Sequence, residues 1–255
     1  MTFSVCIPTI GTDRIRKLAR LLPPPMQGVE YVVSWQEHED TEIPESMQRP
    51  DVTVTRFEGK GVSANRNNAI ENATGEIVLN ADDDIGFVAE NYHKVVTAFE
   101  KDQTLTVALL KCERRGGPKY PKGETVIKKL PKGYWTGAPE IAFKKDSGLR
   151  FDERFGTASG CLEAAEDEKF VYDARKKGFT CCFYPVVIAR HEGESTGTRP
   201  IANPKALQAS GKMIRLEFPL TWMLRIPLKA FRLKRSGRSS FATSLREMWK
   251  GATES

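Results

Sequence analysis

Short runs of β-branched and apolar residues alternate along the chain with segments whose apolar residues recur at helical spacing. The strand-like runs cover residues 3–7, 31–34, 52–56, 76–79, 105–110 and 180–188. Helical spacing covers residues 13–22, 62–72, 88–101 and 163–177. Alternation of this kind predicts an α/β fold in which a mostly parallel sheet is flanked by helices.

Two stretches depart from this alternation. Residues 112–135 are rich in Gly, Pro and Lys and predict a hairpin or flap without helical period. Beyond Pro200, Leu, Met, Trp and Phe are interleaved with Lys and Arg, which predicts a tail of short amphipathic helices interrupted by Pro219 and Pro227. We therefore expect a main domain over residues 1–200 and a basic amphipathic helical tail over residues 201–255.

The charge of the chain is concentrated in that tail. The 255 residues carry a net charge of +6, with 40% apolar and 28% charged residues, as in ordinary soluble globular proteins. Residues 201–255 hold eleven Lys/Arg and three Asp/Glu, a net +8, which leaves −2 for residues 1–200. A nucleic-acid partner is not expected, because the main domain lacks an excess of basic residues to neutralise phosphates.

The cysteines and the N-terminus point to a reducing compartment. Five cysteines occur without C-x-x-C spacing, which favours neither a disulfide framework nor a thiolate zinc site. The first residues lead straight into a strand-like run, unlike a signal peptide, and no apolar run approaches the ~20 residues that span a bilayer. We expect a cytoplasmic protein, peripheral at the inner face of the cell membrane if the tail binds lipid.

Asp82, Asp83 and Asp84 follow directly after the apolar run at residues 76–79. Ligands of open α/β sheets collect at the carboxyl ends of the strands. Adjacent carboxylates repel each other, and a bound divalent metal such as Mg²⁺ or Mn²⁺ would relieve the repulsion and bridge a diphosphate. Taken alone, the triplet is equally well explained as a solvated loop or a helix cap.

The surrounding residues carry a family resemblance. Residues 61–84, GVSANRNNAIENATGEIVLNADDD, resemble the nucleotide-binding segment of glycosyltransferase family two, in which G-x-x-x-A-R-N-x-x-I precedes G-E-[YI]-[IV] and an acidic motif. The opening SVCIPT and the later FDERFG, EDEKF and RKKGF are similar to further motifs of that family. The resemblance covers about residues 3–197 and implies an inverting GT-A (Rossmann-like) nucleotide-sugar transferase of the bacterial capsule or O-antigen type.

Carried over to this chain, the resemblance assigns the donor side of the site. Residues 1–111 become a nucleotide-binding half. Substrate-binding roles fall to Pro8, Thr9, Glu37, Arg66, Asn67, Asp82 and Asp83. Metal ligation falls to Asp84, Asp82 and His191, with Mn²⁺ or Mg²⁺ as the cofactor. Which two of the three aspartates bind metal stays open, because Asn80 stands where the family often has an acid. Only Gln36 and Glu37 stand where it usually has an acidic pair.

The acceptor side is assigned in the same way to residues 112–200. Inverting transfer needs a carboxylate that accepts the proton of the acceptor hydroxyl. The resemblance makes Asp167 this base and places Glu166 beside it, although an acidic helix start is also favoured by the helix dipole. Trp135 would stack on a sugar and Gly137 would allow close approach. The segment after His191 would fold over the diphosphate, with Arg190 or Arg199 neutralising charge.

The resemblance implies transfer of a sugar, most often from a UDP-sugar, to a saccharide or polyprenyl-diphosphate-linked acceptor in surface polysaccharide synthesis. Two alternatives belong to other classes. A sugar nucleotidyltransferase usually has a Gly-rich basic loop after its first strand, which residues 7–13 lack. A non-catalytic adaptor at a membrane surface is the other. The tail pattern fits a helix on an anionic membrane and equally a helix packed on its own domain or a partner subunit, and the oligomeric state stays open.

Overall fold

The computed structural model describes residues 1–255 except 40, 132, 192–200, 202 and 255. Nine strands form one sheet: β1 (Phe3–Ile10), β2 (Val29–Gln36), β3 (Val52–Phe57), β4 (Ile77–Asn80), β5 (Gly86–Phe87), β6 (Leu105–Arg114), β7 (Thr125–Val126), β8 (Ile141–Lys144) and β9 (Thr180–His191). Their order is β3-β2-β1-β4-β8-β6-β9-β5, with β7 paired to β9. The predicted α/β class is confirmed.

The sheet has a parallel part and a mixed part. β3, β2, β1 and β4 are parallel, whereas β8 lies antiparallel between β4 and β6. β9 runs parallel to β6, so that Arg114 and His191 are neighbours at the carboxyl ends of these strands. The carboxyl ends of β1, β4, β6 and β9 therefore approach one another, although their residues are far apart in sequence.

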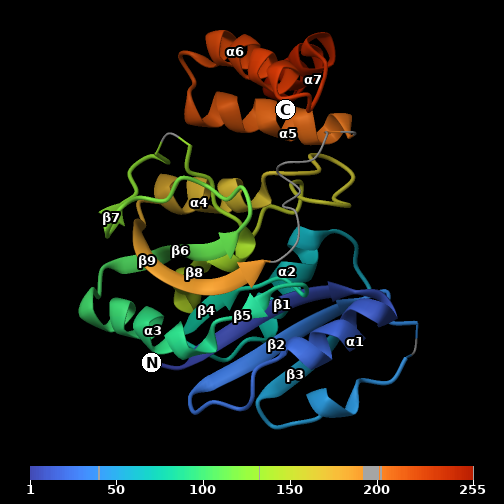
Figure 1. Ribbon diagram of the computed structural model, residues 1–255, viewed down its shortest axis with the longest axis vertical. Coiled ribbons are helices and arrows are strands. Elements are labelled where there is room, and N and C mark those ends of the chain that lie inside the picture. The colour runs from blue at the N-terminus through green and yellow to red at the C-terminus, as the bar shows by residue number, and fades with distance from the viewer. Residues whose placement is uncertain (40, 132, 192–200, 202, 255) are drawn as a thin grey trace.

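Four helices cover the two faces of the sheet (Figure 1). α1 (Gly11–Leu21) and α3 (Tyr92–Lys101) contribute to one apolar core, through residues such as Leu18 and Phe99. α2 (Val62–Asn72) and α4 (Glu166–Lys176) contribute to a second core, through Ile70 and Phe170 among others. The strands supply side chains to both cores, since successive residues of a strand point to opposite faces.

Three further helices form the region after residue 201. α5 (Pro204–Glu217), α6 (Trp222–Arg235) and α7 (Phe241–Thr253) share a separate apolar cluster. Gly211 and Gly251 let α5 and α7 approach closely. A Cβ on Gly211 would lie 1.9 Å from a carbonyl oxygen of α7, and a Cβ on Gly251 would lie 2.0 Å from one of α5. None of the described helices is long and apolar enough to cross a bilayer.

Several element boundaries differ from the sequence prediction. The helix expected from residue 88 begins at Tyr92 after a 3₁₀ turn, and the helix expected from residue 163 begins at Glu166. Part of the expected flap is strand, namely the end of β6 and the short β7. Pro227 does not interrupt α6. A proline inside a helix removes a backbone donor and crowds the preceding turn, but α6 also buries one face in the tail cluster, through Ile226 and Ala230 among others.

Candidate active site

A cavity of about 620 Å³ opens at the carboxyl ends of β1 and β4. Most of the residues in its wall come from four parts of the chain. They are the end of β1 with Pro8 and Thr9, the start of α2, the triplet 82–84, and the segment from Thr157 to the start of α4 with Glu166. Arg114 and His191, at the ends of β6 and β9, also line it, as do Arg14 of α1 and Gln36 of β2. Ligand sites of open α/β sheets lie at this edge.

The three aspartates occupy different environments. Asp83 is buried and accepts hydrogen bonds from Thr9 Oγ1 at 2.7 Å and Arg14 Nη1 at 2.6 Å. Burial raises the pKa of Asp83, and the hydrogen bond from Thr9 and the charge of Arg14 offset part of that rise. Asp82 and Asp84 keep side-chain exposures of 34% and 38%. The side chain of Asp83 thus anchors the loop to Thr9 and Arg14, whereas the carboxylates of Asp82 and Asp84 stay accessible from the cavity.

Arg66 connects the triplet to the start of α4. Its guanidinium is 6% exposed and donates to Asp82 Oδ1 through Nη2 and to Glu166 Oε1 through Nη1, both at 3.0 Å. Asp167 Oδ1 lies 3.5 Å from the same Nη1. The planar fork of an arginine can hold two carboxylates in a defined geometry, which a lysine cannot. Arg66 therefore fixes the spacing between the two acidic groups of the cavity.

Asp167 and Glu166 open α4 and differ in their contacts. Glu166 lines the cavity and is held by Arg66. Asp167 stands beside it, and its Oδ1 is buried without a hydrogen-bond partner. Burial and the neighbouring charge of Glu166 raise the pKa of Asp167 well above its usual range, against the opposing charge of Arg66. When deprotonated, a carboxylate of this kind is a stronger base than an ordinary aspartate. Asp167 itself lies next to the wall residue Glu166 and does not line the cavity.

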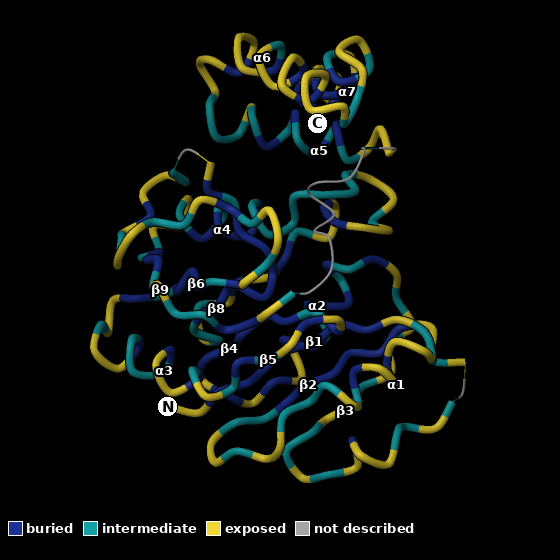
Figure 2. The backbone as a smooth tube through the Cα atoms, viewed as in Figure 1, coloured by how far each residue is buried: buried dark blue, intermediate teal, exposed yellow. Residues whose placement is uncertain are grey.

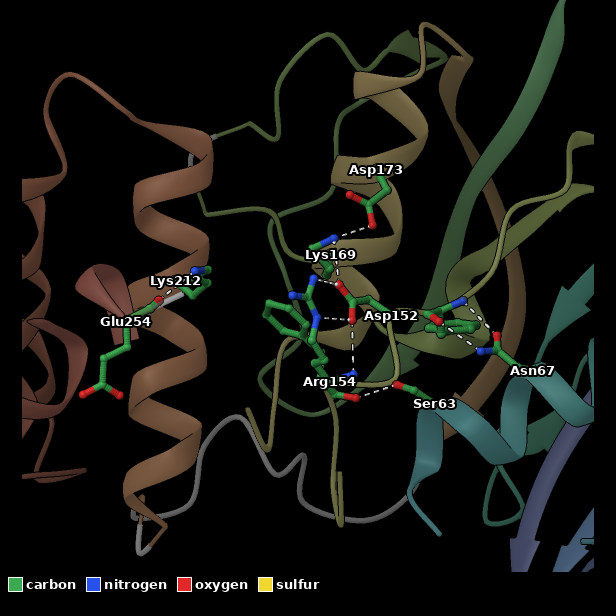
Figure 3. Close-up of polar contacts among 10 residues, drawn as sticks. Ser63, Asn67, Asp152, Arg154, Lys169, Asp173, Lys212 and Glu254 are labelled. Carbon is green, nitrogen blue, oxygen red and sulfur yellow. Dashed lines mark hydrogen bonds and ion pairs between the residues drawn. The ribbon is translucent and has the colours of Figure 1, made fainter. Parts of the chain in front are cut away.

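Contacts between α2 and the segment before α4 hold these acids in place (Figure 3). Ser63 donates to the carbonyl of Phe155 at 2.6 Å, and Asn67 exchanges two hydrogen bonds with the backbone of Phe151. Gly156 packs against α2 so closely that a Cβ there would lie 2.6 Å from Val62 Cγ1. The FDERFG motif is thus explained by packing, because it seats the start of α4 against α2.

Asp152 adds an ionic link within this scaffold. It pairs with Arg154 at 2.7 Å and with Lys169 at 3.2 Å, and Lys169 also pairs with Asp173 at 2.5 Å (Figure 3). Burial disfavours the charged form of Asp152, but these hydrogen bonds outweigh it and bring its pKa to about 2. The segment and α4 are therefore joined by a pair that stays charged at neutral pH.

Asp84 and His191 are the cavity residues whose chemistry would suit a divalent metal bound together with a diphosphate. His191 Nε2 lies 3.8 Å from Asp84 Oδ1, so a carboxylate oxygen and an imidazole nitrogen face the same space. Among the residues that the structure describes, no group of three His, Cys, Asp or Glu could hold a metal ion. Mg²⁺ is commonly held by one or two carboxylates plus substrate phosphates, so a metal at Asp84 and His191 would take its further oxygen ligands from a diphosphate.

Arg114 adds a third arginine to the cavity wall, beside Arg14 and Arg66. Its guanidinium pairs with the fully buried Glu140 at 2.5 Å and lies 5.1 Å over the ring of Trp135. A Cβ on Gly137 would come within 3.2 Å of Arg114 Nη1, so the glycine makes room for the arginine. Trp135 and Gly137, expected at the acceptor, therefore contact Arg114 and are not part of the cavity wall itself.

Two other predicted residues lie elsewhere. Asn67 was expected beside the base or diphosphate, but its side chain is committed to the backbone of Phe151 and to Glu153. Glu37 was expected at the substrate, but the backbone turns there with φ 53° and its side chain is exposed. Gln36, the last residue of β2, lines the cavity instead. Residues 192–200, with Arg199, lie outside the described part, and Arg190 pairs with exposed Glu113.

Sequence reasoning missed several wall residues, of which Asn65 is the most informative. In the motif as aligned on Arg66 and Ile70, Asn65 stands where the family pattern has alanine. Its Nδ2 donates to the carbonyl of Thr9 at 3.1 Å, and its Oδ1 is buried without a partner. The departure from the motif was the signal that could have identified it. Arg14 and Arg114 carried no comparable signal, because a single arginine at a strand end or in a helix is common.

The chain thus combines an α/β fold with an acidic cavity at the carboxyl edge of its sheet, and comparisons with known proteins identify its family. Residues 34–161 match the model of glycosyl transferase family 2, and the chain belongs to this family. No curated protein sequence matches the chain.

Solved structures of S. aureus TarS resemble the fold. The 1–349 fragment has a TM-score of 0.56 at 16% identity, covering 99% of this chain and 90% of that one. The complex of this fragment with UDP has a TM-score of 0.60 at 16% identity, with the same coverage of both chains. The complex with UDP-GlcNAc has a TM-score of 0.57 at 18% identity and covers 95% of this chain and 74% of that one. The chain thus has a GT-A-like glycosyltransferase fold with a helical C-terminal region.

Proposed function

We propose that this protein is an inverting, metal-dependent glycosyltransferase that moves a sugar from a UDP-sugar to a saccharide acceptor. The single observation that carries the proposal is the contact of Arg66 with both Asp82 and Glu166. This contact connects Asp82, which follows β4, to Glu166, which opens α4. A metal-bound nucleoside diphosphate would lie beside the first acid and an acceptor beside the second. The TarS complexes with UDP and UDP-GlcNAc support a uridine diphosphate donor.

The chain's own residues supply the donor side. Thr9, Gln36, Asn65 and Asp82 line the cavity. The first three would contact the nucleoside, and Asp82 would accept a hydrogen bond from a ribose hydroxyl. Asp84 and His191 would hold Mg²⁺ or Mn²⁺, which would neutralise the negative charge that develops on the departing diphosphate. Arg114, at the same edge, adds a fixed positive charge there.

Asp167 would serve as the base on the acceptor side. It takes the proton of the acceptor hydroxyl as that oxygen attacks the anomeric carbon. The bond from that carbon to the diphosphate oxygen breaks, and UDP leaves with the electron pair. Attack opposite to the leaving group inverts the anomeric configuration. Arg66 keeps Glu166 and Asp167 at a set distance from the donor acids.

The acceptor that we propose is a saccharide carried on a polyprenyl diphosphate, in bacterial surface polysaccharide synthesis. Such an acceptor is held at the inner face of the cell membrane, and we propose that the enzyme works there. The positive charge of residues 201–255 is in keeping with this location.

A donor-hydrolysis screen tests the proposal. Purified protein is incubated with UDP-, GDP- and dTDP-sugars in the presence of Mn²⁺ or Mg²⁺, and release of the nucleoside diphosphate is measured. Hydrolysis of at least one UDP-sugar, lost on chelation of the metal, is expected. The absence of both hydrolysis and binding for every donor would contradict the enzyme proposal.

A further inference from the structure

Helix α6 is apolar on two opposite faces. One face is buried in the tail cluster through Trp222, Ile226, Ala230 and Leu233. The other face carries Met223, Leu224, Leu228 and Phe231, and Leu220 precedes it in the turn before the helix. The helix lies at the outer end of the molecule, on the side away from the sheet (Figures 1 and 2).

The outward apolar side chains are strongly exposed. Leu220 is 96% exposed and Leu224 72%, and Met223, Leu228 and Phe231 are each 57–59% exposed. At 100° per residue, the four of these residues that belong to α6 fall within one half of the helix circumference, and Leu220 extends the patch from the preceding turn. A surface helix ordinarily turns polar residues outward, and a contiguous exposed apolar patch marks an interaction site.

The charges around this patch have a single sign. Between Phe218 and Phe241 the chain has six Lys or Arg and no Asp or Glu. Lys234 and Arg235 fall within the same half of the helix as the apolar residues, and Arg225 and Arg232 fall at its border. All four side chains belong to exposed residues. The partner of this surface must therefore present both apolar and anionic groups.

We propose that the outward face of α6 binds the surface of an anionic lipid bilayer. The helix would lie in the plane of the interface, with its apolar side chains at the boundary of headgroups and acyl chains and its cations among lipid phosphates. α6 is too short and too charged to span the bilayer, in agreement with the absence of a spanning helix in the described residues.

A second copy of this chain fits the face less well. A two-fold dimer through α6 would bring the same patch of both copies together. Arg225, Arg232, Lys234 and Arg235 of the two copies would then lie near one another with no acidic residue on α6 to pair with. Like charges across an interface oppose association, whereas an anionic bilayer attracts them.

This inference adds to the proposed function the surface that would hold the enzyme at the membrane, and it rests on that function only for the choice of membrane. Lipid binding is measured by co-sedimentation with vesicles of phosphatidylcholine, with and without phosphatidylglycerol. The test variant carries Leu224→Glu and Leu228→Glu. The matched control is Val126→Glu, which alters a 59%-exposed apolar residue on β7.

Unaltered protein and the Val126→Glu control are expected to sediment with phosphatidylglycerol vesicles, and binding should weaken with rising salt. The double variant should bind at least about tenfold more weakly. Circular dichroism and thermal unfolding should match those of unaltered protein, because both leucines are exposed.

Equal binding by the double variant and unaltered protein would overturn the inference, as would binding that is the same without phosphatidylglycerol. Self-association that the double variant abolishes, in the absence of vesicle binding, would overturn it in favour of a dimer face. Donor hydrolysis without vesicles is expected to be equal in all three proteins. A failure of lipid binding is therefore distinguishable from a failure of the proposed enzyme activity.

Discussion

Arg66 Nη1 donates a hydrogen bond to Glu166 Oε1 at 3.0 Å and thereby joins residues one hundred positions apart in the chain. The same guanidinium holds Asp82 at 3.0 Å. The acid after β4 and the acid that opens α4 are therefore kept in register by one buried side chain. The geometry of the cavity depends on this arginine more than on any direct contact between the acids.

Replacement of Arg66 by lysine should uncouple the two sides of the cavity. A lysine keeps the charge but cannot present two parallel donors to Asp82 and Glu166. We expect the rate of donor hydrolysis to fall about 100-fold, as for a small misplacement of reacting groups. Arg246→Lys, at a 75%-exposed position in α7, is the matched control and should leave the rate unchanged. An Arg66→Lys enzyme with the unaltered rate would show that the bidentate contact is dispensable.

The pH dependence of turnover should report the environment of Asp167. A base is active when deprotonated, and burial with the charge of Glu166 raises the pKa of Asp167. Activity should therefore rise with pH through a higher range than for an ordinary aspartate. Glu166→Gln removes one cause of the rise, so the acidic limb of its profile should move to lower pH. An acidic limb that stays in place or moves upward would count against this assignment.

Metal binding should depend on Asp84. Asp84→Asn removes one anionic oxygen beside His191 and should weaken Mn²⁺ binding in the presence of UDP about tenfold or more. Isothermal titration measures this independently of turnover. Glu113→Gln changes an exposed acid at the end of β6 and serves as the control. Equal Mn²⁺ affinity for Asp84→Asn and the unaltered protein would remove Asp84 from the metal site.

The ion pairs of Asp152 predict a pH-dependent stability. The pKa of Asp152 is about 2 in the folded protein, against 3.8 for the ordinary group, so its charged form favours folding. This stabilisation is present above about pH 4 and is lost as the pH falls toward 2. Asp152→Asn should therefore lower the free energy of unfolding by about 2 kcal/mol at pH 7.

Denaturant unfolding at several pH values measures the effect. The difference between Asp152→Asn and unaltered protein should shrink steadily below pH 4. Asp146→Asn, at an exposed position, should change stability little at any pH. A difference for Asp152→Asn that is constant from pH 7 to the acid range would indicate packing rather than charge as its cause.

Much of the fold could be predicted from the sequence, because the strands of the parallel part are short, apolar and regularly spaced. The helix at Val62–Asn72 was predicted with the bounds that the structure gives. The short strands β5 and β7 were missed, since two residues carry no periodicity. Pro227 was wrongly expected to break a helix, because a local rule cannot register the packing of the buried face.

Site residues that belong to a sequence motif could be predicted, whereas residues that reach the cavity only through tertiary contacts could not. The acids Asp82, Asp84 and Glu166 lie in the cavity because each follows a strand or opens a helix. Arg114 and Asn65 reach the same cavity through tertiary contacts, with buried Glu140 and with the carbonyl of Thr9. Asn67 has the motif position but faces the scaffold, since a helix turns adjacent residues in different directions.

Donor hydrolysis and UDP binding by Asp167→Asn test the central claim most directly. The variant keeps the volume of the side chain but cannot take a proton. The account therefore predicts that UDP affinity stays within about twofold of the unaltered protein. The rate of UDP-sugar hydrolysis should fall by roughly 100-fold or more, which is what general base catalysis contributes. Hydrolysis by Asp167→Asn at the unaltered rate, with UDP binding intact, would contradict the account.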